Sequence, residues 1–166
     1  MFFYEEVLRE FQRKKVKYVI VGGIAFNLLG GMRQTLDLDI LVDMEDENLL
    51  KIIRILRNKG YYVEQPVNPE DFANSRVRKD WIKNKHMKAF NFYKSGKSYE
   101  EVDIIIKSPI NFKEASKNAK IVNVEELDLP VISIDNLIKM KQATGRIHDI
   151  DDIKNLQKFK RIQNEK

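Results

Sequence analysis

Two aspartates separated by one residue open the apolar segment DLDILV at residues 37–42. Such a run is typical of a buried strand, where successive side chains point to opposite faces, so Asp37 and Asp39 share one face. Two carboxylates held this close raise each other's pKa unless a cation lies between them. Carboxylate oxygens are ligands that Mg²⁺ accepts together with substrate phosphates. The pair therefore predicts a magnesium site, and the alternative is the acidic side of an exposed strand.

A diglycine, Gly22-Gly23, stands between a β-branched apolar run at 17–21 and a short apolar segment at 24–29. Because glycine has no Cβ, the backbone here can approach a ligand closely. If the segment that follows is a helix, its free N–H groups and positive dipole end favour phosphate. A simple turn is the alternative, and the sequence has neither the P-loop nor the Rossmann glycine motif. A phosphate cradle beside a carboxylate pair suggests phosphoryl or nucleotidyl transfer.

A third carboxylate, Asp103, is the only charge inside the apolar segment 102–106. A single buried aspartate can simply pair with a nearby Lys or Arg. If its strand lies beside the 37–42 strand, Asp103 instead completes a three-carboxylate site able to hold two Mg²⁺ ions.

The elements that must position these residues follow from the hydrophobic periodicity. We expect helices over 2–14, 24–29, 45–58 and 133–144, the last capped by Ser133 and ended by Gly145, and a final helix beginning at Asp149. We expect strands over 17–21, 37–42, 61–63, 87–93, 102–107 and, as the last one, 121–124; those at 87–93 and 102–107 are antiparallel around a turn at Gly96. Residues 65–80, rich in Pro and Asn, are expected to be mainly a loop with one helical turn near Pro69. This order predicts an α/β (α+β) fold with a mixed β-sheet, helices packed on one face and two C-terminal helices.

Length and composition set further bounds. The 166 residues fit a single domain, with a core over about 1–132 and a helical element over about 133–162. Without cysteine, neither disulfides nor thiolate zinc sites exist. An acidic N-terminus unlike a signal peptide, and no apolar run long enough to span a membrane, lead us to expect a cytoplasmic protein with no membrane partner. The net charge of +5 gathers at 76–88 and 154–166, which are either solvated faces or surfaces for anions such as RNA.

Together these motifs carry a resemblance to a known superfamily. Gly22-Gly23, then RQTLDLD at 33–39, then Val102-Asp103, is similar to the polymerase-β-like nucleotidyltransferase superfamily. Within it the chain looks most like small members: AbiEii-type toxins, with their Arg-x-Thr-x-Asp-x-Asp pattern, and lincosamide adenylyltransferases of similar length. The segment 141–152 resembles an AbiEii-like element, with His148 where many of those proteins have Lys. The resemblance covers about 17–43, 100–107 and 133–156, and it is more specific for the fold than for the substrate.

The resemblance implies a nucleotidyltransferase fold and transfer of NMP from an NTP to an unidentified hydroxyl acceptor with release of pyrophosphate. Asp37, Asp39 and Asp103 would be the catalytic residues and the ligands of a two-metal Mg²⁺ site. The phosphate-binding residues would be Gly22, Gly23, Arg33, Thr35 and Lys141. Two of these have competing roles: Arg33 as a surface charge, and Lys141 on the solvent face of its helix. Asp149 is expected to cap the last helix and pair with Arg146.

Three functions stay open from the sequence. The first is the nucleotidyltransferase, with an NTP and either RNA or a small molecule as partners. The second is an antibiotic adenylyltransferase, against which the basic 65–100 region argues if it forms the wall that receives a polycationic acceptor. The third is a non-catalytic member that binds a nucleotide or a partner, as half of a toxin–antitoxin pair. Clustered carboxylates favour catalysis, because they repel one another without a metal. The aromatic residues Phe72, Trp81, Phe90 and Phe92 are expected to pack in the core.

Overall fold

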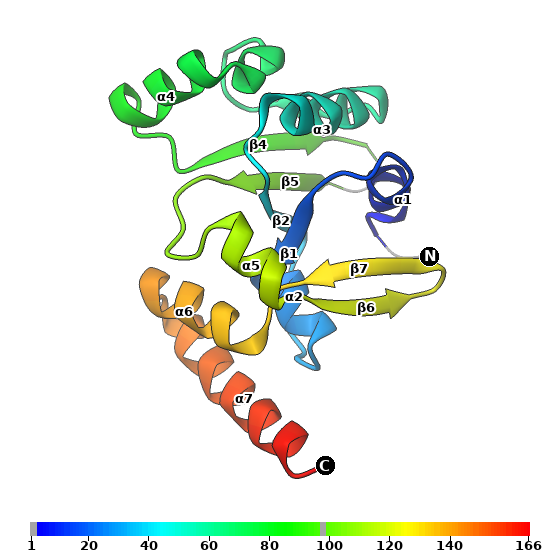
Figure 1. Cartoon of the computed structure of the whole chain (residues 1–166), viewed down its shortest axis with the longest axis vertical. Coiled ribbons are helices and arrows are strands. Elements are labelled where there is room, and N and C mark those ends of the chain that lie inside the picture. Colours follow the sequence, from blue (N-terminus) through cyan, green and yellow to red (C-terminus); the bar gives the residue numbers. More distant parts are fainter. Residues whose placement is uncertain (1–2, 97–98) are drawn as a thin grey trace.

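The computed structural model describes residues 3–96 and 99–166, and seven strands within this part of the chain form one mixed sheet (Figure 1). The order across the sheet is β3-β4-β5-β2-β1-β7-β6. The β2–β5 and β1–β7 pairs are parallel and the other neighbours are antiparallel. The strands are β1 Tyr18–Val21, β2 Asp37–Val42, β3 Tyr62–Val63, β4 Ala89–Lys94, β5 Glu100–Ile105, β6 Lys120–Val124 and β7 Leu127–Val131. The expected α/β fold with a mixed sheet is confirmed.

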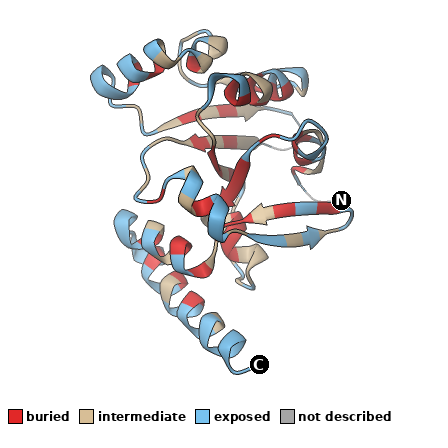
Figure 2. Ribbon diagram, in the orientation of Figure 1, coloured by how far each residue is buried: buried red, intermediate tan, exposed pale blue. Residues whose placement is uncertain are grey.

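The helices are α1 Glu5–Arg13, α2 Gly22–Leu28, α3 Asp46–Asn58, α4 Ser75–Asn84, α5 Phe112–Asn118, α6 Ile134–Thr144 and α7 Ile147–Asn164, with a short 3₁₀ helix, η1, at Pro69–Ala73. Figure 2 shows buried residues concentrated on the sheet and on the sheet-facing sides of α1 and α3, while α4 and α7 are largely exposed. Leu38 and Ile40 of β2 and Val102 and Ile104 of β5 are fully buried. Because side chains alternate along a strand, the residues between them form the opposite face of the sheet.

Most predicted elements are confirmed within one to three residues, and β2 has the predicted bounds. The antiparallel pairing of β4 with β5 is also confirmed. Residue 2 of the first predicted helix, and residues 97–98 of the turn near Gly96, lie outside the described residues.

The prediction of a loop over 65–80 is wrong in its second half, where α4 begins. The side chain of Asn74 accepts hydrogen bonds from the backbone N–H groups of Arg76 and Val77 at 3.0 and 3.3 Å, which satisfies the free donors of the first turn. Trp81 then packs against Phe72 and Phe90. The asparagines that suggested a loop are therefore a helix cap, and tertiary packing stabilises a helix of otherwise weak periodicity.

The prediction that 121–124 is the last strand is also wrong. A further strand, β7, follows β6 and pairs with it in antiparallel orientation. The sequence did not indicate β7 because it contains Pro130, and proline is rare inside strands. β7 pairs with β1 in parallel, and its residues Leu127, Leu129 and Val131 are buried. The helix α5 between β5 and β6 was not predicted either. It is short, and the side chain of Asn111 caps it by accepting from the N–H of Glu114.

The two C-terminal helices are confirmed. Ser133 caps α6 and Gly145 ends it in the left-handed conformation. α7 begins at Ile147, two residues before the predicted start, because Asp149 acts from within the first turn. Its carboxylate accepts from the backbone N–H of Arg146 at 3.1 Å and from its guanidinium at 3.3 Å, which confirms the expected cap and pair. Among the described residues, no helix has both the length and the apolar character needed to cross a membrane.

Candidate active site

Asp39 of β2 lies directly opposite Asp103 of β5, and Asp37 lies opposite Glu101. Residues paired across adjacent strands project from the same face of a sheet. The three predicted carboxylates are therefore brought together on the face opposite Leu38 and Ile40, with Glu101 as a fourth.

The diglycine lies at the same place. Val21 pairs with Asp39, so Gly22 follows at the edge of the acidic cluster and is the first residue of α2. Gly22 has φ +69°, and a Cβ added to it would overlap the carboxylate of Asp39. A Cβ on Gly23 would lie 2.8 Å from Oγ1 of Thr35. Only glycines permit this approach of the α2 N-terminus to β2. Free N–H groups at a helix N-terminus favour an anion, and here they would lie beside the carboxylates.

Electrostatic repulsion is strongest at Asp39. Burial, together with the negative charges of Asp103 and Asp37, raises the pKa of Asp39 from 3.8 to about 7. Arg146 opposes this shift from the start of α7. Within residues 3–96 and 99–166, the side chains of Asp37 and Asp39 have no hydrogen-bond or ion-pair partner. A cation bound beside Asp39 would favour its ionised form.

Asp103 is held from the neighbouring strand. Nδ2 of Asn91 donates to Oδ1 of Asp103 at 2.6 Å, and Nε2 of Gln65 donates to Oδ1 of Asn91 at 2.7 Å. Burial raises the pKa of Asp103, the bond from Asn91 lowers it, and the charge of Asp37 raises it again, with a raised pKa as the result. Burial and the charge of Asp103 also raise the pKa of Glu101. A carboxyl group with a raised pKa at such a position is a candidate general base or acid.

Two of the predicted phosphate-binding residues, Arg33 and Lys141, lie in an ion-paired cluster. Nζ of Lys141 is 2.8 Å from Oδ2 of Asp152 and 3.6 Å from Oδ1 of Asp149. Arg33 contacts the same Oδ2 of Asp152 at 2.7 Å. Lys141 is buried, so the alternative that it lies on the solvent face of its helix is wrong. The cluster ties the segment before β2 to α6 and α7.

Three polar residues at the site escaped prediction. Glu101 has the same two-residue spacing from Asp103 as Asp37 has from Asp39, and this repeat was a usable signal. Asn91 alternates with the buried Phe90 and Phe92, which indicates the polar face of β4. The end of α6 at Gly145 was predicted, but the effect of Arg146 on Asp39 depends on where α7 packs, and this has no local signal.

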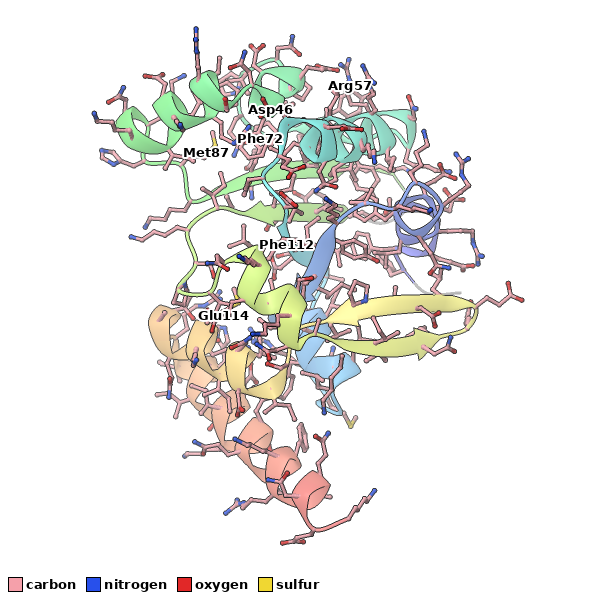
Figure 3. The ribbon with its side chains drawn as sticks, in the orientation of Figure 1. Asp46, Arg57, Phe72, Met87, Phe112 and Glu114 are labelled. Carbon is pink, nitrogen blue, oxygen red and sulfur yellow. The ribbon has the colours of Figure 1, made fainter. Side chains whose placement is uncertain are left out.

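Within the basic 65–100 region that argued against a polycationic acceptor, Gln65 and Asn91 lie at this site, but the basic helix α4 does not. α4 packs through Trp81 onto Phe72 and Phe90, on the face of the sheet opposite Asn91 and Asp103. Arg78 is buried and bonds to Asp46 and to the carbonyl oxygens of Phe72 and Met44. Figure 3 shows Asp46 and Phe72 together under α4, away from α5. The expected core positions of the aromatic residues are confirmed.

The donor set fits a hard divalent cation. It consists of oxygen atoms only, and unpartnered carboxylates with a raised pKa are stabilised by a positive charge. In the part of the chain that is described, no group of three His, Asp or Glu side chains could hold a metal ion as they stand.

With this geometry in place, a comparison with protein-family models decides the family. The model described as aminoglycoside-2″-adenylyltransferase matches residues 4–156. The chain belongs to this family. The protein is thus a member of a nucleotidyltransferase family, as the motifs predicted.

Three solved structures have a fold similar to that of this chain. A lincosamide antibiotic adenylyltransferase, LnuA, crystallised with lincomycin, is 22% identical with a TM-score of 0.61, covering 92% of this chain and 93% of its own. The aminoglycoside enzyme ANT(2″)-Ia in complex with adenylyl-2″-tobramycin is 13% identical with a TM-score of 0.58, covering 92% and 84%. A putative nucleotidyltransferase from Thermotoga maritima is 18% identical with a TM-score of 0.53, covering 98% and 91%. The sequences of curated proteins give no significant match. The AbiEii-type branch stays a prediction.

Proposed function

We propose that this member of the family transfers a nucleoside monophosphate from an NTP to a hydroxyl group of a small-molecule acceptor, and that it depends on a divalent metal. The observation that carries the proposal is the alignment of Asp39 with Asp103 beside Gly22. A cluster of carboxylates next to a helix N-terminus combines a cation site with an anion site, which is what a metal-bound triphosphate requires.

Asp37, Asp39 and Asp103 would hold the metal, and Mg²⁺ bound there would neutralise the triphosphate and the leaving pyrophosphate. The N–H groups of Gly22 and Gly23 would bind the β- and γ-phosphates. Thr35, beside Gly23, and the exposed guanidinium of Arg146, near Asp39, would supply further contacts to the phosphates. Asp103, held by Asn91, would take the proton of the acceptor hydroxyl as its oxygen attacks the α-phosphorus.

Arg33 and Lys141 have a different role in this proposal. Both are engaged by Asp152, and release of Lys141 for a phosphate would leave the buried carboxylate of Asp152 without one of its two cations. We therefore assign them to holding α7, and with it Arg146, in position.

We favour a small molecule over RNA as the acceptor. The basic helix α4, which could bind the RNA backbone, lies on the face of the sheet opposite the carboxylates. An antibiotic is one such molecule, since the family model describes an aminoglycoside adenylyltransferase. The experiment below distinguishes this enzyme from a non-catalytic protein that binds a nucleotide or a partner.

The test measures pyrophosphate release and transfer of label from α-labelled NTPs, with Mg²⁺ or EDTA, in the presence of tobramycin, lincomycin or a small-molecule extract. Asp39→Asn and Asp103→Asn are each expected to lower the rate by roughly 100-fold or more, since metal ligands contribute several kcal/mol to phosphoryl transfer. Asp135→Asn, an exposed carboxylate on α6 that pairs with Lys160, is the matched control and should leave the rate unchanged. Mg²⁺-dependent nucleotide binding without turnover would favour the non-catalytic alternative, and no nucleotide binding at all would end the proposal.

A further inference from the structure

A cavity of about 670 Å³ lies next to the carboxylates but contains none of them. It is formed between the ends of β2 and β5 and the helix α5. Its lining includes apolar side chains from all three elements and polar ones from α5, among them Leu41, Ile105, Phe112, Lys113, Ser116 and Lys117. Its volume is within the range of pockets that bind molecules of drug size.

The cavity continues the face that carries the carboxylates. Leu41 follows Asp39 by two residues on β2, and Ile105 follows Asp103 by two residues on β5. Side chains two apart share a face and lie about 7 Å from each other along a strand. Figure 3 shows Phe112 on the side of α5 toward these strand ends and Glu114 toward α6. A molecule in the cavity therefore has its near end beside Asp39 and Asp103.

The glycines lie beside the carboxylates and away from the cavity. Gly23 faces Thr35, which precedes β2, and Gly22 faces Asp39, whereas the cavity begins at Leu41. Along the chain the diglycine and the carboxylates therefore share the level of residues 35–39, and the cavity follows them. In phosphoryl transfer the attacking and leaving oxygens are roughly in line. With the β- and γ-phosphates on the diglycine side, the attacking oxygen approaches from the cavity side.

The charge of the cavity restricts what it can hold. Lys113 and Lys117 are exposed at its rim, and within the residues described neither has an ion-pair partner. Lys139 of α6 approaches the same helix, but it pairs with Glu114. One acidic residue, Asp43, also lines the cavity, but its carboxylate lies 3.8 Å from Nζ of Lys17 and accepts from the backbone N–H of Glu45. The interior contributed by Leu41, Ile105 and Phe112 is apolar. An apolar interior with unpaired cations at the rim favours a neutral or anionic molecule and disfavours a polycation.

We propose that this cavity binds the body of the acceptor, and that the acceptor is a hydroxyl-bearing molecule with an apolar part and a neutral or anionic remainder. The proposal rests on the proposed nucleotidyl transfer and adds the acceptor's place and chemical class. It separates this chain from an enzyme whose acceptor is a polycation.

The first test uses 1-anilinonaphthalene-8-sulfonate, an apolar anion whose fluorescence reports binding, with tobramycin as the polycationic comparison. The dye is expected to bind the wild type equally well with and without saturating Mg²⁺ and α,β-methylene-ATP, and tobramycin is not expected to displace it. Ser116→Trp fills the cavity from an exposed helix position and should weaken dye binding about 10-fold or more, as should Lys113→Glu with Lys117→Glu. Asn118→Trp, exposed on the same helix but outside the cavity lining, is the control and should bind the dye normally.

The second test is transfer of label from α-labelled ATP to a small-molecule extract separated by charge. Labelled product is expected from the neutral or anionic fraction, and Ser116→Trp should lower its formation about 10-fold or more without changing the affinity for Mg²⁺ and nucleotide. Displacement of the dye by the nucleotide analogue would assign the cavity to the nucleoside and overturn the acceptor assignment alone. Product from the polycationic fraction, or an unaffected Ser116→Trp, would overturn it as well. A wild type that neither binds nucleotide with Mg²⁺ nor releases pyrophosphate removes the proposed function, and the acceptor assignment with it.

Discussion

Asp39 and Asp103, 64 residues apart in the sequence, are direct neighbours across the parallel strands β2 and β5. Their register places both carboxylates on one face, beside the first turn of α2. Burial raises the pKa of both groups; the charge of Asp103 adds to the rise at Asp39, and the charge of Asp37 adds to the rise at Asp103. A bound divalent cation would favour the ionised forms.

Replacement of Gly22 by Ala should disrupt the nucleotide site. A methyl group there overlaps the carboxylate of Asp39, and the left-handed φ of +69° adds strain of about 1–3 kcal/mol for any residue with a Cβ. We expect a lower free energy of unfolding by urea denaturation and loss of nucleotide binding by calorimetry. Gly96→Ala is the control, because a Cβ there meets nothing within 4 Å. Normal nucleotide affinity in Gly22→Ala would contradict a phosphate cradle at this turn.

Stability should depend on pH through Asp39. Its pKa is 3.8 in the ordinary state and about 7 when folded, so the folded protein holds a proton that the unfolded chain releases between these values. The stabilisation is therefore present at low pH and is lost as the pH rises toward 7. Without metal, we expect the Tm of the wild type to fall between pH 5 and 8, and Asp39→Asn to have the higher Tm of the two at pH 8.

Magnesium should oppose the fall in Tm that the wild type shows at high pH. It binds the ionised carboxylates, so it should raise the Tm of the wild type at pH 8 but have little effect at pH 5, where Asp39 is protonated. Calorimetric melting scans at both pH values, with Mg²⁺ or EDTA, measure this. A wild-type Tm at pH 8 that does not respond to Mg²⁺ would argue against the metal site.

Asn91→Ala should shift the pH dependence of the reaction. The amide lowers the pKa of Asp103 by bonding to its ionised form, so its loss raises that pKa. The acidic limb of the pH–rate profile should move to higher pH, and kcat should fall by about 10-fold as Asp103 loses its orientation. Gln65→Ala, one hydrogen bond further away, should give a smaller shift in the same direction. An unchanged profile in Asn91→Ala would exclude Asp103 as the group that titrates.

Lys141→Met separates the structural role of Lys141 from phosphate binding. Its side chain is 6% exposed and that of Asp152 is 9% exposed, and removing one partner of such a buried pair costs about 3–5 kcal/mol. We expect a large loss of stability by urea denaturation, and weaker nucleotide binding only together with that loss, because Arg146 then loses its position. Lys139→Met on the same helix, whose ion pair is exposed, should change stability by less than about 1 kcal/mol. A stable variant with weakened nucleotide binding would restore the phosphate-binding role.

The sequence by itself determined the local elements and the chemistry they carry. Alternation placed Asp37 and Asp39 on one face, the capping residues Ser133 and Gly145 bounded a helix, and the β-branched run before Gly22 defined a strand. These features depend on neighbours within a few residues, where backbone sterics and hydrogen bonds act directly.

Only the tertiary structure decided which distant residues meet. The β2–β5 register aligned Asp103 with Asp39, and the packing of α6 against α7 paired Lys141 with Asp152. The packing of Trp81 against the core stabilised α4 in a segment whose composition is typical of a loop. The tertiary structure also forms the cavity beside α5. This helix is too short for its hydrophobic periodicity to be recognised in the sequence. Such pairings are set by burial and charge summed over the whole fold, so they have no counterpart in the spacing of residues along the chain.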